Sequence, residues 1–479
     1  MENRTILKSF LWTALESYST QGIAFIVSIF MARILAPADY GVIGIIGVFL
    51  ALSDIFIDAG FTNALINKKN CNNDDFSTVF YTNVVISIIF FNILYFTAPF
   101  IAAFYNNPVL IWTTRAMALT FVISSFGAVS MTILTKELRF KAKAIITFIV
   151  SCISGFIGVF LAYRGWGVWA LVWQSVLSCL ARVIIYIFYV RWKPLLRFSL
   201  TSFKELFKFG GNLLGSNIIY TLYNNIYSLV IGKVFNATQL GYFSRAEGYA
   251  KLVPINISGI LSKILFPILS KIKNNDEEMI ELHHKFILVT SALLFPGCLF
   301  IAGLAAPLVY LLITEKWMPI VPLLQILSFA GIFEHFSTIN NNFILSKGKS
   351  NYFLKMQIWT KPFGLLLLGL SVCFNLSIVA WGKVIYSVVC LITSYYFLRR
   401  VLFVNLHRDI KDIIKMLLLS GGLANICLII FNRIDYTWAA LTIGFILCFG
   451  IYFLGLKFLC PNVFLMLKHI MQKDNRNEL

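Results

Sequence analysis

Apolar stretches long enough to cross a lipid bilayer follow one another along almost the whole chain. A hydrocarbon core about 30 Å thick needs roughly 20 helical residues to span it, and the chain offers about fourteen such stretches. They lie near 10–34, 40–66, 77–104, 109–134, 142–163, 167–189, 205–232, 239–269, 283–313, 318–345, 352–373, 377–399, 412–431 and 436–459. The sequence lacks the alternating segments of about ten residues that mark a transmembrane barrel. It therefore predicts an all-α polytopic membrane protein.

Lysine and arginine are distributed unevenly over the gaps between these stretches. Basic residues in short loops resist translocation, so cytoplasmic loops accumulate them. One set of gaps, together with both ends of the chain, holds most of the basic residues. The opposite set holds only Arg33, Arg164, Lys233, Lys316 and Arg433. We therefore predict that both termini are cytoplasmic, and we attribute the net charge of +19 to topology rather than to nucleic-acid binding.

The first apolar stretch and the cysteines indicate neither a cleaved signal peptide nor a metal or disulfide site. The first apolar stretch is longer than a typical signal-peptide core and ends in Met31-Ala32-Arg33, so we expect it to remain as a signal anchor. The nine cysteines contain no C-x-x-C pair, and the histidines form no cluster in the sequence. These patterns predict free thiols, with no metal, disulfide framework or cofactor.

An internal repeat organises the chain. Residues 29–44, IFMARILAPADYGVIG, match residues 229–244, LVIGKVFNATQLGYFS, at an offset of 200, with Arg33 and Gly41 corresponding to Lys233 and Gly241. Each repeat then holds six spans, and an even number gives both halves the same orientation. Transporters built from parallel repeats place their substrate path between the halves. We predict an N-terminal six-helix lobe at 1–198, a C-terminal six-helix lobe at 199–400, and an appended helix pair with a cytoplasmic tail at 401–479. Chance similarity between apolar segments is the alternative.

The segment that joins the two predicted lobes carries a helix-start pattern. Ser202-Phe203-Lys204-Glu205 fits a capping box, in which the serine and the glutamate satisfy the free amides of a helix N-terminus. We expect an interfacial turn here on the cytoplasmic surface, with a plain hydrophilic loop as the alternative.

Ionisable side chains inside the predicted spans are the main candidates for functional residues. A charged residue at the bilayer centre costs about 2.5 kcal/mol or more, so such residues face water, an opposite charge or a ligand. The basic set comprises Arg115, Arg182, Arg245, Lys251, Lys263, Lys361 and Lys383. The acidic set is smaller and includes Glu16, Asp54, Asp58, Glu247 and Glu334. Because cations outnumber acids, we predict a cavity with surplus positive charge.

Structural alternatives exist for several of these residues. Arg115 and Lys383 lie near the outer ends of their spans, where long side chains can reach the interface. Glu247 and Lys251 have the spacing of an ion pair along one helix, in which neither residue contacts a substrate. Pro254 and Pro267 in the eighth span remove helix hydrogen bonds, which permits the bending that alternating access requires but also occurs in static bundles.

Four runs resemble a known family. They are ARILAPADYGVIG at 32–44, ELRFKA at 137–142, GYFSRAEGYAKLVP at 241–254 and ILFPILSKI at 264–272. Together they are similar to the Wzx-type polysaccharide transporters of the multidrug/oligosaccharidyl-lipid/polysaccharide exporter superfamily. The resemblance covers nearly the whole chain, including the arrangement of two six-helix lobes plus two helices. The resemblance implies a structural role in turns for four residues, Arg33, Gly41, Lys233 and Gly241.

The resemblance implies an activity. Members of this family flip undecaprenyl-pyrophosphate-linked oligosaccharides across the bacterial cytoplasmic membrane for the synthesis of O-antigen, capsule or related glycans. A cationic cavity suits a pyrophosphate head group. We therefore predict a multi-pass inner-membrane flippase, not an enzyme, that works by alternating access of the two lobes. Its predicted partners are the lipid-linked oligosaccharide and membrane lipids, with the polysaccharide polymerase and export machinery as candidates and no nucleic acid.

Specific residues follow from this hypothesis. The predicted substrate-binding residues are Arg182, Arg245, Lys251, Lys361, Arg115 and Lys383, and the ion-coupling candidates are Asp54, Asp58, Glu247 and Glu334. Relatives commonly carry an acid in the segment aligned with 225–228, where this chain has Tyr227, so a coupling role for that position is in doubt.

Two other functions fit the sequence less well. A cation-coupled small-molecule exporter favours a cavity of the opposite charge. A membrane glycan polymerase needs a substantial outer loop, and the predicted outer gaps are short.

Overall fold

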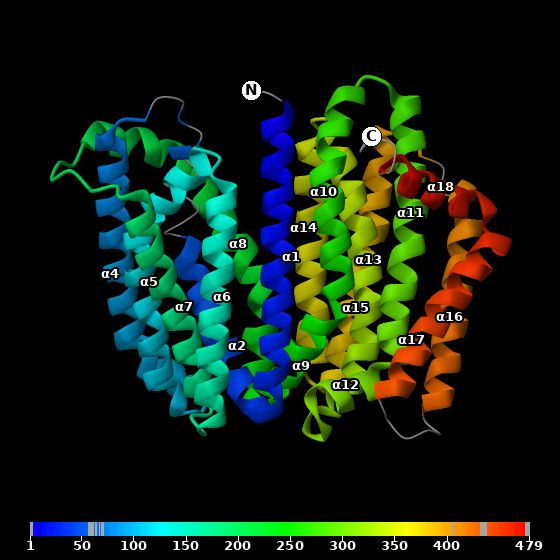
Figure 1. Ribbon diagram of the computed structural model, residues 1–479, viewed down its shortest axis with the longest axis horizontal. Helices are drawn as coiled ribbons and strands as arrows, with labels where there is room; N and C mark the ends of the chain where they lie inside the picture. The colour runs from blue at the N-terminus through cyan, green and yellow to red at the C-terminus, as the bar shows by residue number, and fades with distance from the viewer. Residues whose placement is uncertain are drawn as a thin grey trace. The chain divides into compact units, whose positions relative to one another are not determined.

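A computed structural model of the chain is built from helices and connecting loops (Figure 1). It describes residues 3–55, 62, 65, 66, 68, 71–404, 407–431 and 438–474, and no strand occurs within these ranges. The helices up to residue 250 are α1 (Asn3–Ile34), α2 (Pro37–Asp54), α4 (Asn73–Phe104), α5 (Val109–Lys136), α6 (Phe140–Tyr163), α7 (Val168–Val190), α8 (Leu200–Val234) and α9 (Ala237–Ala250). The later ones are α10 (Leu252–Ile272), α11 (Asp276–Gly303), α12 (Ala305–Ile313), the 3₁₀ turn η2 (Glu315–Trp317), α13 (Ile320–Ser346), α14 (Ser350–Ser371), α15 (Leu376–Val401), α16 (His407–Phe431), α17 (Trp438–Leu459) and α18 (Pro461–Asp474).

Length and composition mark many of these helices as membrane spans. Within the described ranges, nine helices are long and apolar enough to cross a bilayer, and two shorter apolar segments lie at Tyr18–Ile34 and Pro37–Ser53. Large aromatic side chains on several of them point away from the protein, and Phe100, Phe156 and Phe188 are among the most exposed. Such faces suit lipid rather than water. The predicted fold class, an all-α polytopic membrane protein, is confirmed.

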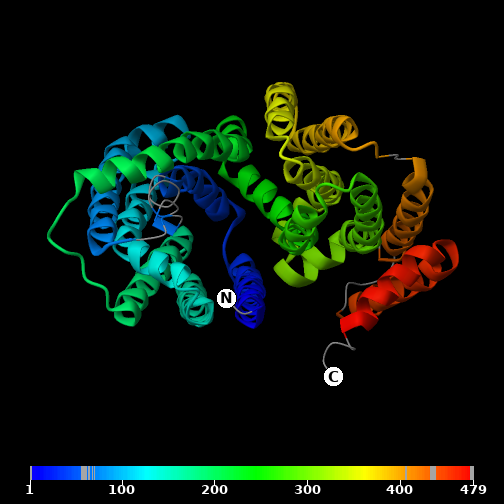
Figure 2. The same ribbon diagram turned by 90° about the horizontal axis from the view of Figure 1, so that it is seen from above.

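The chain divides into two compact units, Met1–Gly241 and Tyr242–Leu479. Within the first unit, α5 packs against α4 and α7, α6 packs against α1 and α7, and α8 packs against α2 and α4. Within the second unit, α13 packs against α10, α11, α14 and α15, while α16 packs against α11 and α17. Figure 2 shows the helices of each unit nearly end-on. The lobes predicted at 1–198 and 199–400 stay a prediction.

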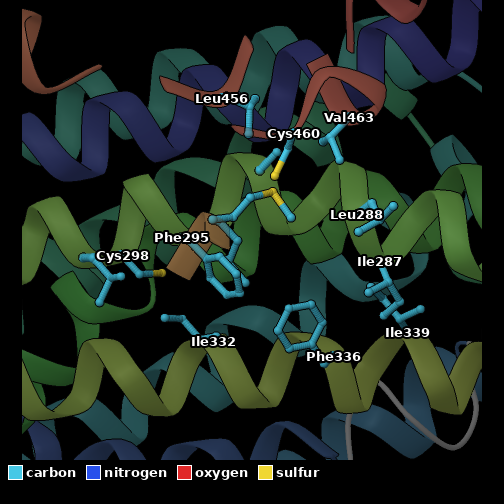
Figure 3. Close-up of a cluster of buried hydrophobic side chains, with 14 of the residues drawn as sticks. Ile287, Leu288, Phe295, Cys298, Ile332, Phe336, Ile339, Leu456, Cys460 and Val463 are labelled. Carbon is cyan, nitrogen blue, oxygen red and sulfur yellow. The ribbon is translucent and has the colours of Figure 1, made fainter. Parts of the chain in front are cut away.

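A large apolar cluster forms the core of the second unit. Phe295 of α11 and Phe336 of α13 meet edge to face, with ring centroids 5.9 Å apart, and both rings are almost fully buried. On the other side of α11, Leu456 and Val463 from α17 and α18 complete the cluster (Figure 3). The C-terminal helices therefore pack into this core. The predicted cytoplasmic tail thus contains a further helix, α18.

Two predicted spans are each divided into two helices. The span predicted at 239–269 forms α9 and α10, and the one at 283–313 forms α11 and α12. A proline occupies the third position of the second helix in both cases, at Pro254 in α10 and at Pro307 in α12. Proline has no amide hydrogen to bond the carbonyl four residues earlier, which explains a break at this point. The side chain of Pro267 lies outside the described residues.

Helix α8 begins at Leu200, two residues before the predicted capping box. Its N-cap is Ser199, whose Oγ accepts a hydrogen bond from the amide of Ser202 at 3.2 Å. The capping box predicted at 202–205 is therefore wrong, because Ser202 already lies inside the helix. Glu205 instead accepts a hydrogen bond from Lys68 Nζ at 2.9 Å. This bond is the main cause of a raised pKa at Lys68.

The cap can be tested by removing its hydroxyl. We expect Ser199→Ala to lower the stability of the protein by about 1 kcal/mol, because it leaves helix amides unsatisfied. Lys204→Ala, an exposed substitution in the first turns of the same helix, should have little effect. Thermal unfolding of the detergent-solubilised variants measures the difference, and equal melting temperatures would exclude a capping role for Ser199.

The two copies of the sequence repeat meet at their glycines. A Cβ on Gly41 would lie 1.7 Å from the carbonyl oxygen of Ala237, and a Cβ on Gly241 would lie 1.9 Å from that of Pro37. Positions 37 and 237, like 41 and 241, correspond in the repeat, so the contact is reciprocal. Such reciprocity is what a two-fold relation between repeats produces. The crossing fixes the start of α9, which carries two of the predicted site residues.

A second repeat position also has a structural role. Lys233, at the end of α8, donates a hydrogen bond to the carbonyl oxygen of Phe104 at 2.5 Å and lies 4.4 Å from the centroid of that ring. It thereby satisfies a free carbonyl at the C-terminus of α4.

Candidate functional site

Charged side chains from four helices and a helix junction gather in the membrane-spanning part of the second unit. We call Glu247, Lys251, Glu334, Lys361 and Lys383 the charged cluster. Glu247 comes from α9, Lys251 from the α9–α10 junction, and the others from α13, α14 and α15 respectively. With three lysines and two glutamates, the cluster carries surplus positive charge.

Glu247 lies at the centre of the closest contacts. Its Oε1 accepts a hydrogen bond from Lys251 Nζ at 2.6 Å, and the same oxygen accepts another from Lys383 Nζ. The i,i+4 pair expected from the sequence is thus present, and a second lysine from a distant part of the chain joins it. One carboxylate oxygen therefore holds two ammonium groups.

Lys383 is the most buried member of the cluster. Only 8% of this residue is exposed, and its Nζ lies 5.8 Å from the centroid of the Phe243 ring. The structural alternative, in which Lys383 extends to the membrane surface, does not hold here, because the ammonium group points to Glu247. A buried charge of this kind requires a partner, and a carboxylate together with an aromatic face provides one.

Glu334 and Lys361 extend the cluster across the neighbouring helices. Glu334 lies on α13, which packs against α10 and against α14, the helix of Lys361. Lys361 and Glu334 are each partly exposed, and the side chain of Lys251 is 33% exposed. A ligand can therefore reach Lys251 and Lys361, whereas Lys383 is enclosed. Arg245 lies on α9 half a turn before Glu247 and is also partly exposed.

Close packing at the α9–α10 junction positions Lys251. A Cβ on Gly331 of α13 would lie 2.6 Å from Cγ of Pro254. Glycine at this position lets α13 approach the first turn of α10. The approach brings Glu334, one turn along α13, toward the junction.

Arg182 lies apart from this cluster, in the first unit. It lines a pocket of about 430 Å³ between α2, α5 and α7. Hydroxyl groups of Thr120, Ser124, Ser175 and Ser178 share the lining. The rest of the lining is largely apolar, so the pocket combines one cation and four hydroxyl groups with an apolar wall. A substrate contact for Arg182 stays a prediction.

Arg115 has partners of its own in the first unit. Its Nε donates a hydrogen bond to the carbonyl oxygen of Tyr95 at 3.2 Å, and its guanidinium lies 4.2 Å from the Tyr95 ring centroid and 4.9 Å from that of Trp112. These contacts tie α5 to α4 and favour a structural role.

Two of the predicted ion-coupling residues lie outside the described residues. They are Asp58 and the side chain of Asp54, and the side chain of the intramembrane Lys263 falls there too. Tyr227, which stands where relatives commonly carry an acid, is buried in α8. Ion coupling through Asp54 or Asp58 stays a prediction.

Two buried histidines make polar contacts that the sequence did not predict. His283 Nε2 is 2.9 Å from Asn340 Oδ1, and Asn340 Nδ2 donates to Ser394 Oγ at 3.0 Å. His335 Nδ1 is 2.6 Å from Ser258 Oγ. These residues are far apart in sequence, and only the position of His335 beside Glu334 could have drawn attention to it. Within the described ranges, no group of three or more potential ligands is placed to hold a metal ion.

Comparison with protein families identifies the chain. A family described as "Polysaccharide biosynthesis protein" matches residues 30–322, which is more than half of the sequence. The chain belongs to the polysaccharide biosynthesis protein family. The resemblance to polysaccharide transporters that the four sequence runs indicated is confirmed.

Several relatives in this family are named for surface-polysaccharide synthesis. The teichuronic acid biosynthesis protein TuaB of Bacillus subtilis (strain 168) is 26% identical over 379 residues, which cover 78% of this chain and 77% of TuaB. The lipopolysaccharide biosynthesis protein WzxC of Escherichia coli (strain K12) is 25% identical, with coverage of 73% and 71%. The succinoglycan biosynthesis transport protein ExoT of Rhizobium meliloti (strain 1021) is 25% identical, with coverage of 70% and 68%. Of these three relatives, ExoT is named as a transport protein. The prediction that the chain is a membrane transporter and not an enzyme is confirmed.

Solved structures share the fold at low sequence identity. The lipid II flippase MurJ in an inward-closed conformation aligns with a TM-score of 0.73 and 15% identity, covering 95% of this chain and 99% of MurJ. An inward-facing multidrug transporter of the MATE family aligns with a TM-score of 0.61 and 15% identity, covering 81% and 98%. These structural similarities establish the fold of this member of the polysaccharide biosynthesis protein family.

Proposed function

We propose that this protein is a flippase that moves a polyprenyl-diphosphate-linked oligosaccharide, of the undecaprenyl class, across the bacterial inner membrane for surface-polysaccharide synthesis. The charged cluster of the second unit is the observation that carries the proposal. Lys251 and Lys383 converge on Glu247, and with Lys361 and Glu334 the cluster holds three lysines against two glutamates in a region where charge is costly. A diphosphate supplies the negative charge that would stabilise them.

The proposed mechanism assigns a role to each group of residues. Lys251, Lys361 and Lys383 contact the diphosphate, and Arg245, half a turn before Glu247 on α9, contacts phosphate or an acidic sugar. Arg182 lines a second polar contact region in the first unit. Alternating access exposes the cluster first to the cytoplasmic side and then to the outer side, so the head group crosses without entering lipid. Both termini face the cytoplasm in this proposal, as the distribution of basic residues indicates.

The positive net charge of the charged cluster argues against a small-molecule exporter of organic cations. A transporter of organic cations needs acids that face its substrate, whereas Glu247 in this structure is engaged by two lysines. An anionic substrate is attracted by the same arrangement.

The first test identifies the bound lipid. Native mass spectrometry of the protein extracted in mild detergent should show a co-purifying lipid that fragments into polyprenyl phosphate and sugars. After delipidation, the protein should rebind an added polyprenyl-diphosphate-linked sugar in preference to phosphatidylglycerol. If it binds only ordinary phospholipid, even with the diphosphate-linked sugar in excess, the proposed function is wrong.

A further inference from the structure

We propose that Glu247 is an internal counter-anion that occupies the phosphate position of the charged cluster until a diphosphate displaces it. The inference rests on the proposed function and adds a specific step to it, because it assigns to Glu247 the control of binding and release. It differs from the sequence-based hypothesis of an ion-coupling acid.

The geometry of the lysines carries the argument. Lys251 Nζ and Lys383 Nζ converge on a single oxygen, Glu247 Oε1, although the two lysines are far apart in the chain. Two ammonium groups that meet at one oxygen form the arrangement by which lysines hold a phosphate oxygen. The carboxylate therefore fills a preformed anion position.

Burial explains why the position needs an anion at all times. Lys383 is 8% exposed, and two adjacent ammonium groups without a counter-charge repel each other in a membrane interior. Glu247 removes that repulsion while no substrate is bound. A diphosphate brings at least the same charge, so the carboxylate and the substrate compete for the same two lysines.

The members of the anion position differ in exposure. The side chains of Lys251 and Glu247 are 33% and 23% exposed, whereas Lys383 is enclosed. A phosphate group can therefore approach Lys251 first and then replace Glu247 at Lys383. The return of the carboxylate provides a competing anion that favours release. Glu334, the second acid of the cluster, lies on α13, which packs against α10 and α14.

The test measures the binding of geranylgeranyl diphosphate, with geranylgeraniol as the uncharged reference, to the purified full-length protein. If Glu247 competes with phosphate, Glu247→Gln should bind the diphosphate with a Kd lower by about tenfold, because a charge-assisted contact no longer has to be broken. Its transport rate in vesicles should fall, since release is slower. Glu281→Gln is the matched control, because Glu281 and Lys285 form an i,i+4 pair at the same distance of 2.6 Å. It should leave both quantities unchanged.

The possible outcomes separate the two proposals. Wild-type protein that binds the diphosphate while Glu247→Gln binds it equally or more weakly overturns the counter-anion role and leaves the proposed function standing. If neither protein prefers the diphosphate to the alcohol, the proposed function fails and the inference fails with it. Glu247→Asp covers the case in which the glutamine variant does not fold. The shorter carboxylate keeps its charge but cannot reach both lysines, so its Kd should fall several-fold, and an unchanged or raised Kd overturns the inference.

Discussion

Gly41→Ala and Gly241→Ala should each prevent accumulation of correctly folded protein. An alanine Cβ at these positions would lie 1.7 Å and 1.9 Å from backbone carbonyl oxygens, far inside van der Waals contact. Backbone atoms cannot rotate away as a side chain can, so α2 and α9 would have to separate. Overpacking of this severity costs about 3 kcal/mol or more. The expected result is loss of the monodisperse protein peak in size-exclusion chromatography, or a much lower melting temperature where some protein survives.

Each glycine has a matched control in its own helix. Gly47 of α2 and Gly248 of α9 have no atom within 4 Å of an added Cβ. Alanine there should be neutral or should stabilise the helix by about 0.5 to 1 kcal/mol, because alanine has the higher helix propensity. The double variant Gly41→Ala/Gly241→Ala should cost less than the sum of the single changes, since one separation of α2 and α9 accommodates both clashes. Melting temperatures of Gly41→Ala and Gly241→Ala that match those of the control variants would contradict the reciprocal crossing.

The sequence predicted the crossing only in part. The repeat identified Gly41 and Gly241 as equivalent positions, but an alignment of two segments does not reveal that the segments touch. Helix positions were predicted well, because a span of apolar residues has a length fixed by the bilayer. The sequence analysis expected that Pro254 could bend the eighth span, but it did not predict the divisions at Lys251 and Leu304. Whether a proline bends or divides a helix depends on the packing of the neighbouring helices.

The charged cluster shows a similar limit. The i,i+4 spacing of Glu247 and Lys251 is visible in the sequence, since both lie on one stretch of chain. The addition of Lys383 to the same oxygen depends on how α9 and α15 approach each other, which no local pattern encodes. For the same reason, the sequence analysis assigned Arg115 and Lys383 the same structural alternative, that of cations near the ends of their spans. The structure separates them, because Arg115 binds a backbone carbonyl and two rings and Lys383 binds a carboxylate.

Neutralising two lysines of the cluster should abolish transport without unfolding the protein. In Lys361→Gln/Lys383→Gln, Glu247 keeps its contact with Lys251, so no buried carboxylate is left without a partner. Each lost lysine removes a charge-assisted contact to a phosphate, worth about 1.5 to 3 kcal/mol. Two such losses predict a decrease of at least about 100-fold in transport of a polyprenyl-diphosphate-linked sugar in reconstituted vesicles.

Two further variants distinguish a substrate contact from a general effect of charge. Lys285→Gln removes a positive charge from the same unit, at an i,i+4 pair with Glu281 that is about half exposed, and it should leave transport unchanged. Lys361→Arg/Lys383→Arg keeps both charges and should retain measurable transport, although arginine presents its donors in a different geometry. Melting temperatures establish that each variant is folded before its rate is compared. Transport by the glutamine variant at the wild-type rate, in a protein that is folded, would show that the head group does not pass the charged cluster.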